Sequence, residues 1–200
     1  GIEGRPHAEI ALETDCALTA DDQIALVHDP LLHRGTTLTG WARDRTAAEI
    51  TAAFIRGGDG TVSDEHPLLL EDLWPLIDGR SLTVQLEVKA ICDVRLAHMT
   101  CQTLCEHLES TPPPPGVRIE IISFWPDVLP TAAASGWDTR LIVAAPHQPA
   151  DHVDEWRDAG LSLMSGVCND ATLARLLERY APDAIATDRP NELRHELLVP

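Results

Sequence analysis

Short runs of aliphatic and β-branched residues alternate along the chain with segments whose apolar positions recur every three or four residues. The short runs predict strands, and the segments with the longer period predict helices. Most of the strand runs are almost continuously apolar, which is typical of a parallel sheet covered by helices on its faces. We therefore expect an α/β fold built from repeated strand–helix units.

The predicted strands are 9–15, 24–28, 82–88, 117–122, 139–144, 161–164 and 184–187. The predicted helices are 47–56, 69–77, 94–109, 127–135, 151–159, 171–180 and 191–197. Thr46, with Glu49 three residues later, predicts the N-cap of the first helix, and Asn169-Asp170 predicts another. Units of roughly 20–30 residues fit a (β/α)₈ barrel, for which about 200 residues is the lower limit.

Composition narrows the class of protein. The chain has 200 residues, of which 44% are hydrophobic, so it has enough apolar residues for the core of one domain. The chain has 15 Lys and Arg residues and 32 Asp and Glu residues, which gives a formal net charge of −17 at pH 7. This charge argues against nucleic acid and against an anionic membrane surface as partners. No apolar stretch is long enough to form a transmembrane segment.

The five cysteines include no CxxC pair, and their number is odd. We expect buried free thiols in a reducing compartment, and hence a cytoplasmic protein, although a cleaved signal would leave no trace. Residues 1–7 contain the sequence Ile2-Glu3-Gly4-Arg5, a site used to remove purification tags. Residues 1–7 are therefore either a tag remnant or a native loop, and the predicted domain spans residues 8–200.

Chemically active side chains gather at the predicted strand ends, where α/β folds place their sites. Alternation places Glu13 and Asp15 on one side of the first strand, and Glu87 and Lys89 on one side of another. His28 follows the second strand. Three carboxylates, an imidazole and an ammonium are thus predicted to surround one point.

Each of these pieces alone has an ordinary explanation. The paired carboxylates are typical of a solvated or arginine-paired rim, the histidine of a loop, and the Glu–Lys pair of a surface salt bridge. Together they provide three hard oxygen ligands, which suit Mg²⁺ or Ca²⁺. Because a bound cation screens the carboxylates and polarises a phosphoryl group, the acidity of the chain does not exclude a phosphate substrate.

The combined pattern resembles the glycerophosphodiester phosphodiesterase family from about residue 8 to residue 195. The matching residues in the first part are Glu13-Thr14-Asp15, Leu18-Thr19-Ala20-Asp21, His28-Asp29-Pro30, Leu32, Arg34, Gly40, Asp44, Thr46, Glu49 and Pro67 to Leu73. Those in the second part are Glu87-Val88-Lys89, Ser123-Phe124, Val167-Cys168-Asn169-Asp170 and Thr187-Asp188-Arg189-Pro190.

The resemblance implies a TIM barrel with a small insertion after the second strand, and metal-dependent hydrolysis of glycerophosphodiesters to glycerol 3-phosphate and an alcohol. It assigns the metal, Mg²⁺ or Ca²⁺, to Glu13, Asp15 and Glu87. It assigns proton transfer to His28 and phosphate binding to Lys89. Further substrate contacts are expected from Arg34, Phe124 and Trp125, the last two forming an apolar wall.

Two features depart from the family pattern. The first strand unit of the family, which carries a His-Arg-Gly motif, is missing before residue 8, and His33-Arg34-Gly35 belongs to a loop instead. Gly166 stands where the family often has a tryptophan. We therefore expect an incomplete or open barrel. Either the native protein has this unit and the present chain omits it, or another element or another chain, such as a second copy in a homo-oligomer, fills the gap. The third option is a divergent, open and catalytically weakened relative. The alternatives are a catalytically impaired binding or regulatory domain, and a phospholipase D-like relative that acts on lysophospholipids.

Overall fold

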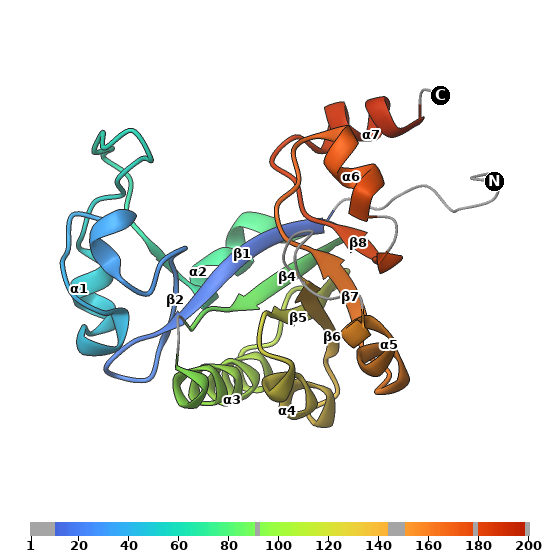
Figure 1. Cartoon of the computed structure of the whole chain (residues 1–200). Helices are drawn as coiled ribbons and strands as arrows, with labels where there is room; N and C mark the ends of the chain where they lie inside the picture. Colours follow the sequence, from blue (N-terminus) through green and yellow to red (C-terminus); the bar gives the residue numbers. More distant parts are fainter. Residues whose placement is uncertain (1–10, 91–92, 144–150, 178–179, 199–200) are drawn as a thin grey trace.

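The computed structural model describes residues 11–90, 93–143, 151–177 and 180–198 (Figure 1). The strands are β1 (Ala11–Leu18), β2 (Ile24–Leu26), β3 (Leu68–Leu69), β4 (Leu82–Val88), β5 (Val117–Ser123), β6 (Asp138–Val143), β7 (Ser162–Ser165) and β8 (Ala184–Ile185). The helices are α1 (Ala47–Thr51), α2 (Leu70–Ile77), α3 (Val94–Ser110), α4 (Leu129–Ala134), α5 (Asp151–Asp158), α6 (Ala171–Leu177) and α7 (Pro190–Leu198). In the described part of the chain, no helix has both the length and the apolar character needed to cross a bilayer.

The strands form one sheet in the order β3-β2-β1-β4-β5-β6-β7-β8. β1 and β4 to β8 run parallel, which confirms the predicted α/β fold. β2 is an exception, because it pairs antiparallel with β1, and β3 is a short antiparallel strand that the sequence did not predict. Only residues 19–23 separate β1 from β2, which is too short for the crossover that a parallel pair requires.

Alternating residues of the sheet face two different apolar clusters. Leu86, Ile121 and Leu141 belong to the main core, where α2, α3 and α4 pack on the sheet. Figure 1 shows α3, α4 and α5 along the same side of the strands. On the opposite face, Ile122 and Met164 belong to a smaller cluster contributed by β5, β6 and β7. Two covered faces are what a barrel wall requires, since its strands separate an interior from an outer helical layer.

The sheet is not closed within the described residues. β8 pairs with β7 alone, and residues 11–15 of β1 pair with β4 alone, because β2 reaches only Cys16 to Leu18. The open form of the barrel predicted from the sequence is therefore confirmed for this part of the chain. Residues 1–7, either tag remnant or loop, lie outside the described residues, as does Cys92. The four described cysteines are buried and free.

Residues 27–67 form an insertion between β2 and β3, at the left of Figure 1. It has a small core of its own, in which Leu32 and Ile50 pack against the end of β1 and β2. The predicted cap of α1 is confirmed: the Glu49 backbone N–H donates to the Thr46 hydroxyl, and the Glu49 carboxylate accepts from the Thr46 N–H. The insertion follows β2 directly and begins next to Leu26, which pairs with Cys16 of β1.

His107 of α3 holds the β1–β2 turn and α2 together. Its Nδ1 lies 2.5 Å from Glu71 Oε1 of α2, and its Nε2 lies 3.1 Å from the carbonyl oxygen of Asp22 in the turn. We expect His107→Ala to lower the free energy of unfolding by about 1–2 kcal/mol, because the partly buried contact to Glu71 is lost together with the exposed contact to Asp22. His98→Ala, an exposed position on the same helix, is the matched control and should change it by less than about 0.5 kcal/mol. Equal effects in urea denaturation would show that His107 does not join these elements.

Candidate metal and phosphate site

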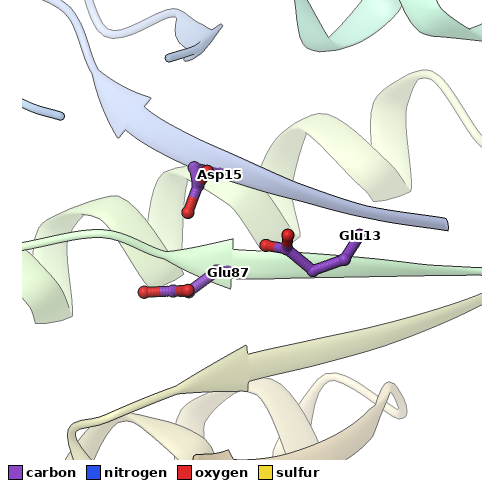
Figure 2. A group of neighbouring side chains, drawn as sticks. All are labelled: Glu13, Asp15 and Glu87. Carbon is purple, nitrogen blue, oxygen red and sulfur yellow. The ribbon is translucent and has the colours of Figure 1, made fainter. Parts of the chain in front are cut away.

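Three carboxylates converge where the carboxyl end of β4 lies beside β1, which continues to Leu18 and does not end at Asp15 as the sequence pattern predicted. Glu13 and Asp15 alternate along β1, and Glu87 lies opposite Asp15 in the parallel register. One oxygen of each lies within 4.8 Å of an oxygen of the others (Figure 2). Asp15 and Glu87 are buried, whereas Glu13 is exposed. We call Glu13, Asp15 and Glu87 the acidic triad.

The environment of the acidic triad disfavours negative charge. Burial, followed by the charges of Asp15 and Glu87, raises the pKa of Glu13 from 4.5 to about 7. Burial is also the largest cause that raises the pKa of Glu87 above 4.5, against the opposing effect of Lys89. Glu13 is exposed as a whole residue, but its carboxyl is partly desolvated beside the other two carboxylates. Three carboxylates this close favour a bound cation.

Lys89, just after β4, supplies a positive charge to the acidic triad. Its Nζ lies 2.8 Å from Glu87 Oε1 and 3.0 Å from Asp15 Oδ1. Burial alone would lower the pKa of Lys89, but the hydrogen bond and charge of Glu87, together with Asp15, raise it above 10.5. The ammonium therefore stays protonated between two carboxylates.

His28 and Arg34 meet at Asp29, at the start of the insertion. Asp29 Oδ2 lies 3.3 Å from His28 Nδ1 and 3.4 Å from Arg34 Nε, and Arg34 Nη1 donates to Oδ1 at 3.4 Å. The Asp29 carboxylate is shielded, while the imidazole is largely exposed. The charge of His28 contributes to lowering the pKa of Glu13 and of Glu87, so the imidazole lies within electrostatic range of the acidic triad.

A cleft of about 390 Å³ adjoins the acidic triad. Its lining comprises Glu87, Val88, Lys89, Ala90, Phe124 and Trp125. The Trp125 indole N–H donates to the Ala90 carbonyl at 2.9 Å, which fixes the ring against the segment that follows β4. Phe124 is partly exposed. The cleft thus combines an ammonium, a carboxylate and two aromatic rings.

The structure therefore brings together six of the eight residues predicted for the site: Glu13, Asp15, Glu87, Lys89, Phe124 and Trp125. The remaining two, His28 and Arg34, share Asp29, and the described contacts of the Arg34 guanidinium are to Asp29 and not to the acidic triad. Asp29 has no role among those predicted from the sequence, although it directly follows His28 and precedes Pro30.

The donor set fits a divalent metal. Glu13, Asp15 and Glu87 offer hard oxygen ligands from two adjacent strands, and the described residues place a cation, the Lys89 ammonium, against two of them. Mg²⁺ and Ca²⁺ both prefer such oxygens and keep further positions for water or a phosphate oxygen. The donor set alone does not favour one of these metals over the other.

Comparison with known proteins adds the fold to this geometry. No family model matches the chain. A stretch of 79 residues is 34% identical to the uncharacterized protein YqiK of Bacillus subtilis, and the match spans 39% of this chain and 32% of that protein. A crystal structure from Silicibacter pomeroyi, assigned to the glycerophosphoryl diester phosphodiesterases, aligns with a TM-score of 0.70 and 20% identity. That alignment covers 94% of this chain and 83% of the other.

Two further solved structures give the same answer. An Oleispira antarctica phosphodiesterase in complex with sn-glycerol-3-phosphate has a TM-score of 0.69 and 21% identity, over 92% of this chain and 83% of that one. The Thermotoga maritima glycerophosphodiester phosphodiesterase has a TM-score of 0.60 and 14% identity, over 96% of this chain and all of that one. The chain has the glycerophosphodiester phosphodiesterase fold. This fold and the acidic triad are two independent observations, since the first rests on the backbone and the second on side chains.

Proposed function

We propose that the chain is a metal-dependent glycerophosphodiester phosphodiesterase, which hydrolyses a glycerophosphodiester to glycerol 3-phosphate and an alcohol. The observation that carries the proposal is the acidic triad with Lys89, beside β1 at the carboxyl end of β4. The fold supports it, because a phosphodiesterase of that fold has been solved with sn-glycerol-3-phosphate.

The residues divide the work of phosphodiester hydrolysis. Glu13, Asp15 and Glu87 hold the metal, which supplies a Lewis acid that stabilises charge on the phosphoryl oxygens. Lys89 contributes a second positive charge toward the phosphate. Phe124 and Trp125 form the apolar wall of the cleft, against which the carbon atoms of the substrate pack.

Proton transfer falls to His28. A new P–O bond forms to the attacking oxygen of water or of a neighbouring substrate hydroxyl, and the P–O bond to the leaving alcohol breaks. The attacking oxygen loses one proton and the leaving alkoxide gains one, so the protons balance, and an imidazole can accept the first or donate the second. Asp29 holds His28 through Nδ1, which leaves Nε2 for this transfer.

The proposal is tested by hydrolysis of glycerophosphocholine and glycerophosphoethanolamine with Mg²⁺, with Ca²⁺ and with a chelator. We expect metal-dependent release of glycerol 3-phosphate, and a loss of about 10²–10³-fold in kcat for His28→Ala, because one side chain then no longer transfers a proton. His98→Ala, an exposed histidine on α3, is the control and should retain wild-type activity.

No turnover by folded wild-type protein with either metal would contradict the proposal. A binding or regulatory domain on the same fold would then be the better interpretation. Both activities use the same phosphoryl chemistry and differ in their substrates. Turnover confined to lysophospholipids would therefore identify the phospholipase D-like alternative.

A further inference from the structure

Lys89 is the only lysine among the 200 residues, and the other fourteen of the 15 Lys and Arg residues are arginine. The single lysine lies in the acidic triad, where its side chain is only 16% exposed. An ammonium is a compact point charge with three rotatable donors, whereas a guanidinium is a planar fork. The site therefore uses the side chain whose charge fits between two converging carboxylates.

The ammonium lies against the same oxygens that a metal would need. Its Nζ contacts Asp15 Oδ1 at 3.0 Å and Glu87 Oε1 at 2.8 Å, and both residues belong to the set whose oxygens converge within 4.8 Å. A dication held by these carboxylates would lie a few ångströms from the ammonium. Two positive charges at that distance in a shielded site repel by several kcal/mol at an effective dielectric constant of about 20. Both cations cannot keep these contacts.

A destination for the ammonium adjoins its present position. Lys89 itself lines the cleft with Phe124 and Trp125. Glu87 pairs with Ile122 in the sheet, and Lys89 and Phe124 lie two residues beyond this pair, just past the ends of β4 and β5. The four-carbon lysine side chain has enough rotatable bonds to turn from the carboxylates into this space.

We propose that Lys89 is the resident cation of the acidic triad, and that its ammonium turns from the carboxylates into the adjoining cleft when a divalent metal binds. In the cleft the ammonium would face the phosphate of a substrate, a consequence that rests on the function proposed above. Metal binding would thus precede productive phosphate binding.

The single lysine makes the displacement directly observable. In wild-type protein labelled with ¹⁵N-lysine, the Nζ group of Lys89 gives the one side-chain ammonium signal. We expect its hydrogen exchange with water to become at least tenfold faster when Mg²⁺ or Ca²⁺ saturates the site, while KCl of equal ionic strength leaves the rate unchanged. If calorimetry showed that the metal binds while the hydrogen-exchange rate of the Lys89 ammonium did not change, the proposal would be overturned.

A variant tests the competition independently. We expect Lys89→Met to bind Mg²⁺ or Ca²⁺ at least tenfold more tightly than the wild type, and to have a lower Tm without metal, because the carboxylates lose their cation. Arg80→Met removes one positive charge at the opposite end of β4, where the side chain is exposed, and should change metal affinity by less than threefold. Equal or weaker metal binding by Lys89→Met would overturn the proposal.

These measurements use no substrate, so the displacement and the proposed activity can fail separately. Displacement without turnover would contradict the phosphodiesterase activity and leave the role of Lys89 intact. Turnover with Lys89 still on the carboxylates would overturn the displacement alone. No metal binding to either the wild type or Lys89→Met would overturn both the displacement and the metal dependence.

Discussion

Replacing Glu87 with glutamine is expected to lower kcat/KM for glycerophosphodiester hydrolysis by about 10⁴-fold. The substitution keeps the shape of the side chain but removes a buried charge from the acidic triad and one of the two ion-pair partners of Lys89. In the proposed reaction, metal and phosphate binding both depend on that charge, so the transition state would lose more than one stabilising interaction. Steady-state hydrolysis of glycerophosphocholine gives the loss in kcat/KM, and calorimetry gives the loss in metal affinity.

Glu109→Gln is the matched control, because it removes one carboxylate from an exposed position on α3. It should leave both measurements within about twofold of the wild type. If Glu87→Gln kept more than a tenth of the wild-type activity while still binding metal, Glu87 would not be a ligand that the reaction needs. If the loss of activity were accompanied by unfolding, seen in the circular dichroism spectrum, the experiment would be repeated with Asp15→Asn.

The acidic triad could be predicted from the sequence because its geometry follows from two regularities. Alternation along a strand places Glu13 with Asp15, and Glu87 with Lys89, on one side. Parallel pairing then brings Asp15 opposite Glu87. Neither step depends on long-range packing detail, so the local strand pattern was enough to predict the acidic triad.

The antiparallel course of β2 was missed although its signal is local. The run from Ile24 is apolar throughout, like the parallel strands, and its hydrophobic pattern does not distinguish the two directions. The short connection of residues 19–23 does distinguish them, since a parallel strand needs a dozen or more residues to return. The turn has a positive φ of 56° at Asp22, which is tolerated by aspartate.

The early end of α1 could not be predicted from local sequence. The pattern indicated a helix over residues 47–56, but α1 ends at Thr51. Beyond it, the Phe54 N–H donates to the Thr37 hydroxyl and Ile55 forms a bridge with Thr36. These partners lie 17 and 19 residues earlier in the chain, so tertiary pairing overrides the local helical preference.

A buried polar network inside the sheet was also missed, and its partners are equally distant in sequence. Glu120 of β5 is 4% exposed and accepts two hydrogen bonds from Arg140 of β6, at 2.7 and 3.1 Å. Gln85 of β4 donates to the same carboxylate at 2.8 Å. Arg140 Nη1 also donates to the Ser162 hydroxyl of β7 at 3.2 Å. The network thus joins four adjacent strands on the same face of the sheet as the acidic triad, since Gln85 and Glu87 are two residues apart on β4.

Arg140→Met is expected to lower the free energy of unfolding by about 3 kcal/mol at pH 7. The substitution fills similar volume but leaves the buried Glu120 carboxylate without its bidentate partner, and an uncompensated buried charge is costly. Arg118, 3.5 Å from Glu120, replaces only part of that pairing because its side chain is mostly exposed. Arg95→Met, an exposed position on α3, is the control and should change the free energy of unfolding by less than about 0.5 kcal/mol in urea denaturation.

The pH dependence identifies Glu120 as the cause. Burial opposes ionisation of this carboxyl, but the hydrogen bonds of Arg140 and Gln85, with the charge of Arg140, hold its pKa below 4.5. A carboxyl whose pKa is lowered in the folded state stabilises it above about pH 4.5, and this stabilisation disappears as the pH falls through the lowered value. The difference between the wild type and Arg140→Met should therefore shrink below about pH 4.5, where Glu120 takes up a proton.

A second substitution separates the lost ion pair from lost packing. In Glu120→Gln combined with Arg140→Met, no buried charge is left without a partner, so more than half of the lost free energy of unfolding should return. If the double variant were as unstable as Arg140→Met at every pH, the loss would come from packing around the arginine side chain. The buried pair would then contribute little to holding β5 and β6 together, and the shape of the barrel interior would rest on Ile122, Ile142 and Met164 instead.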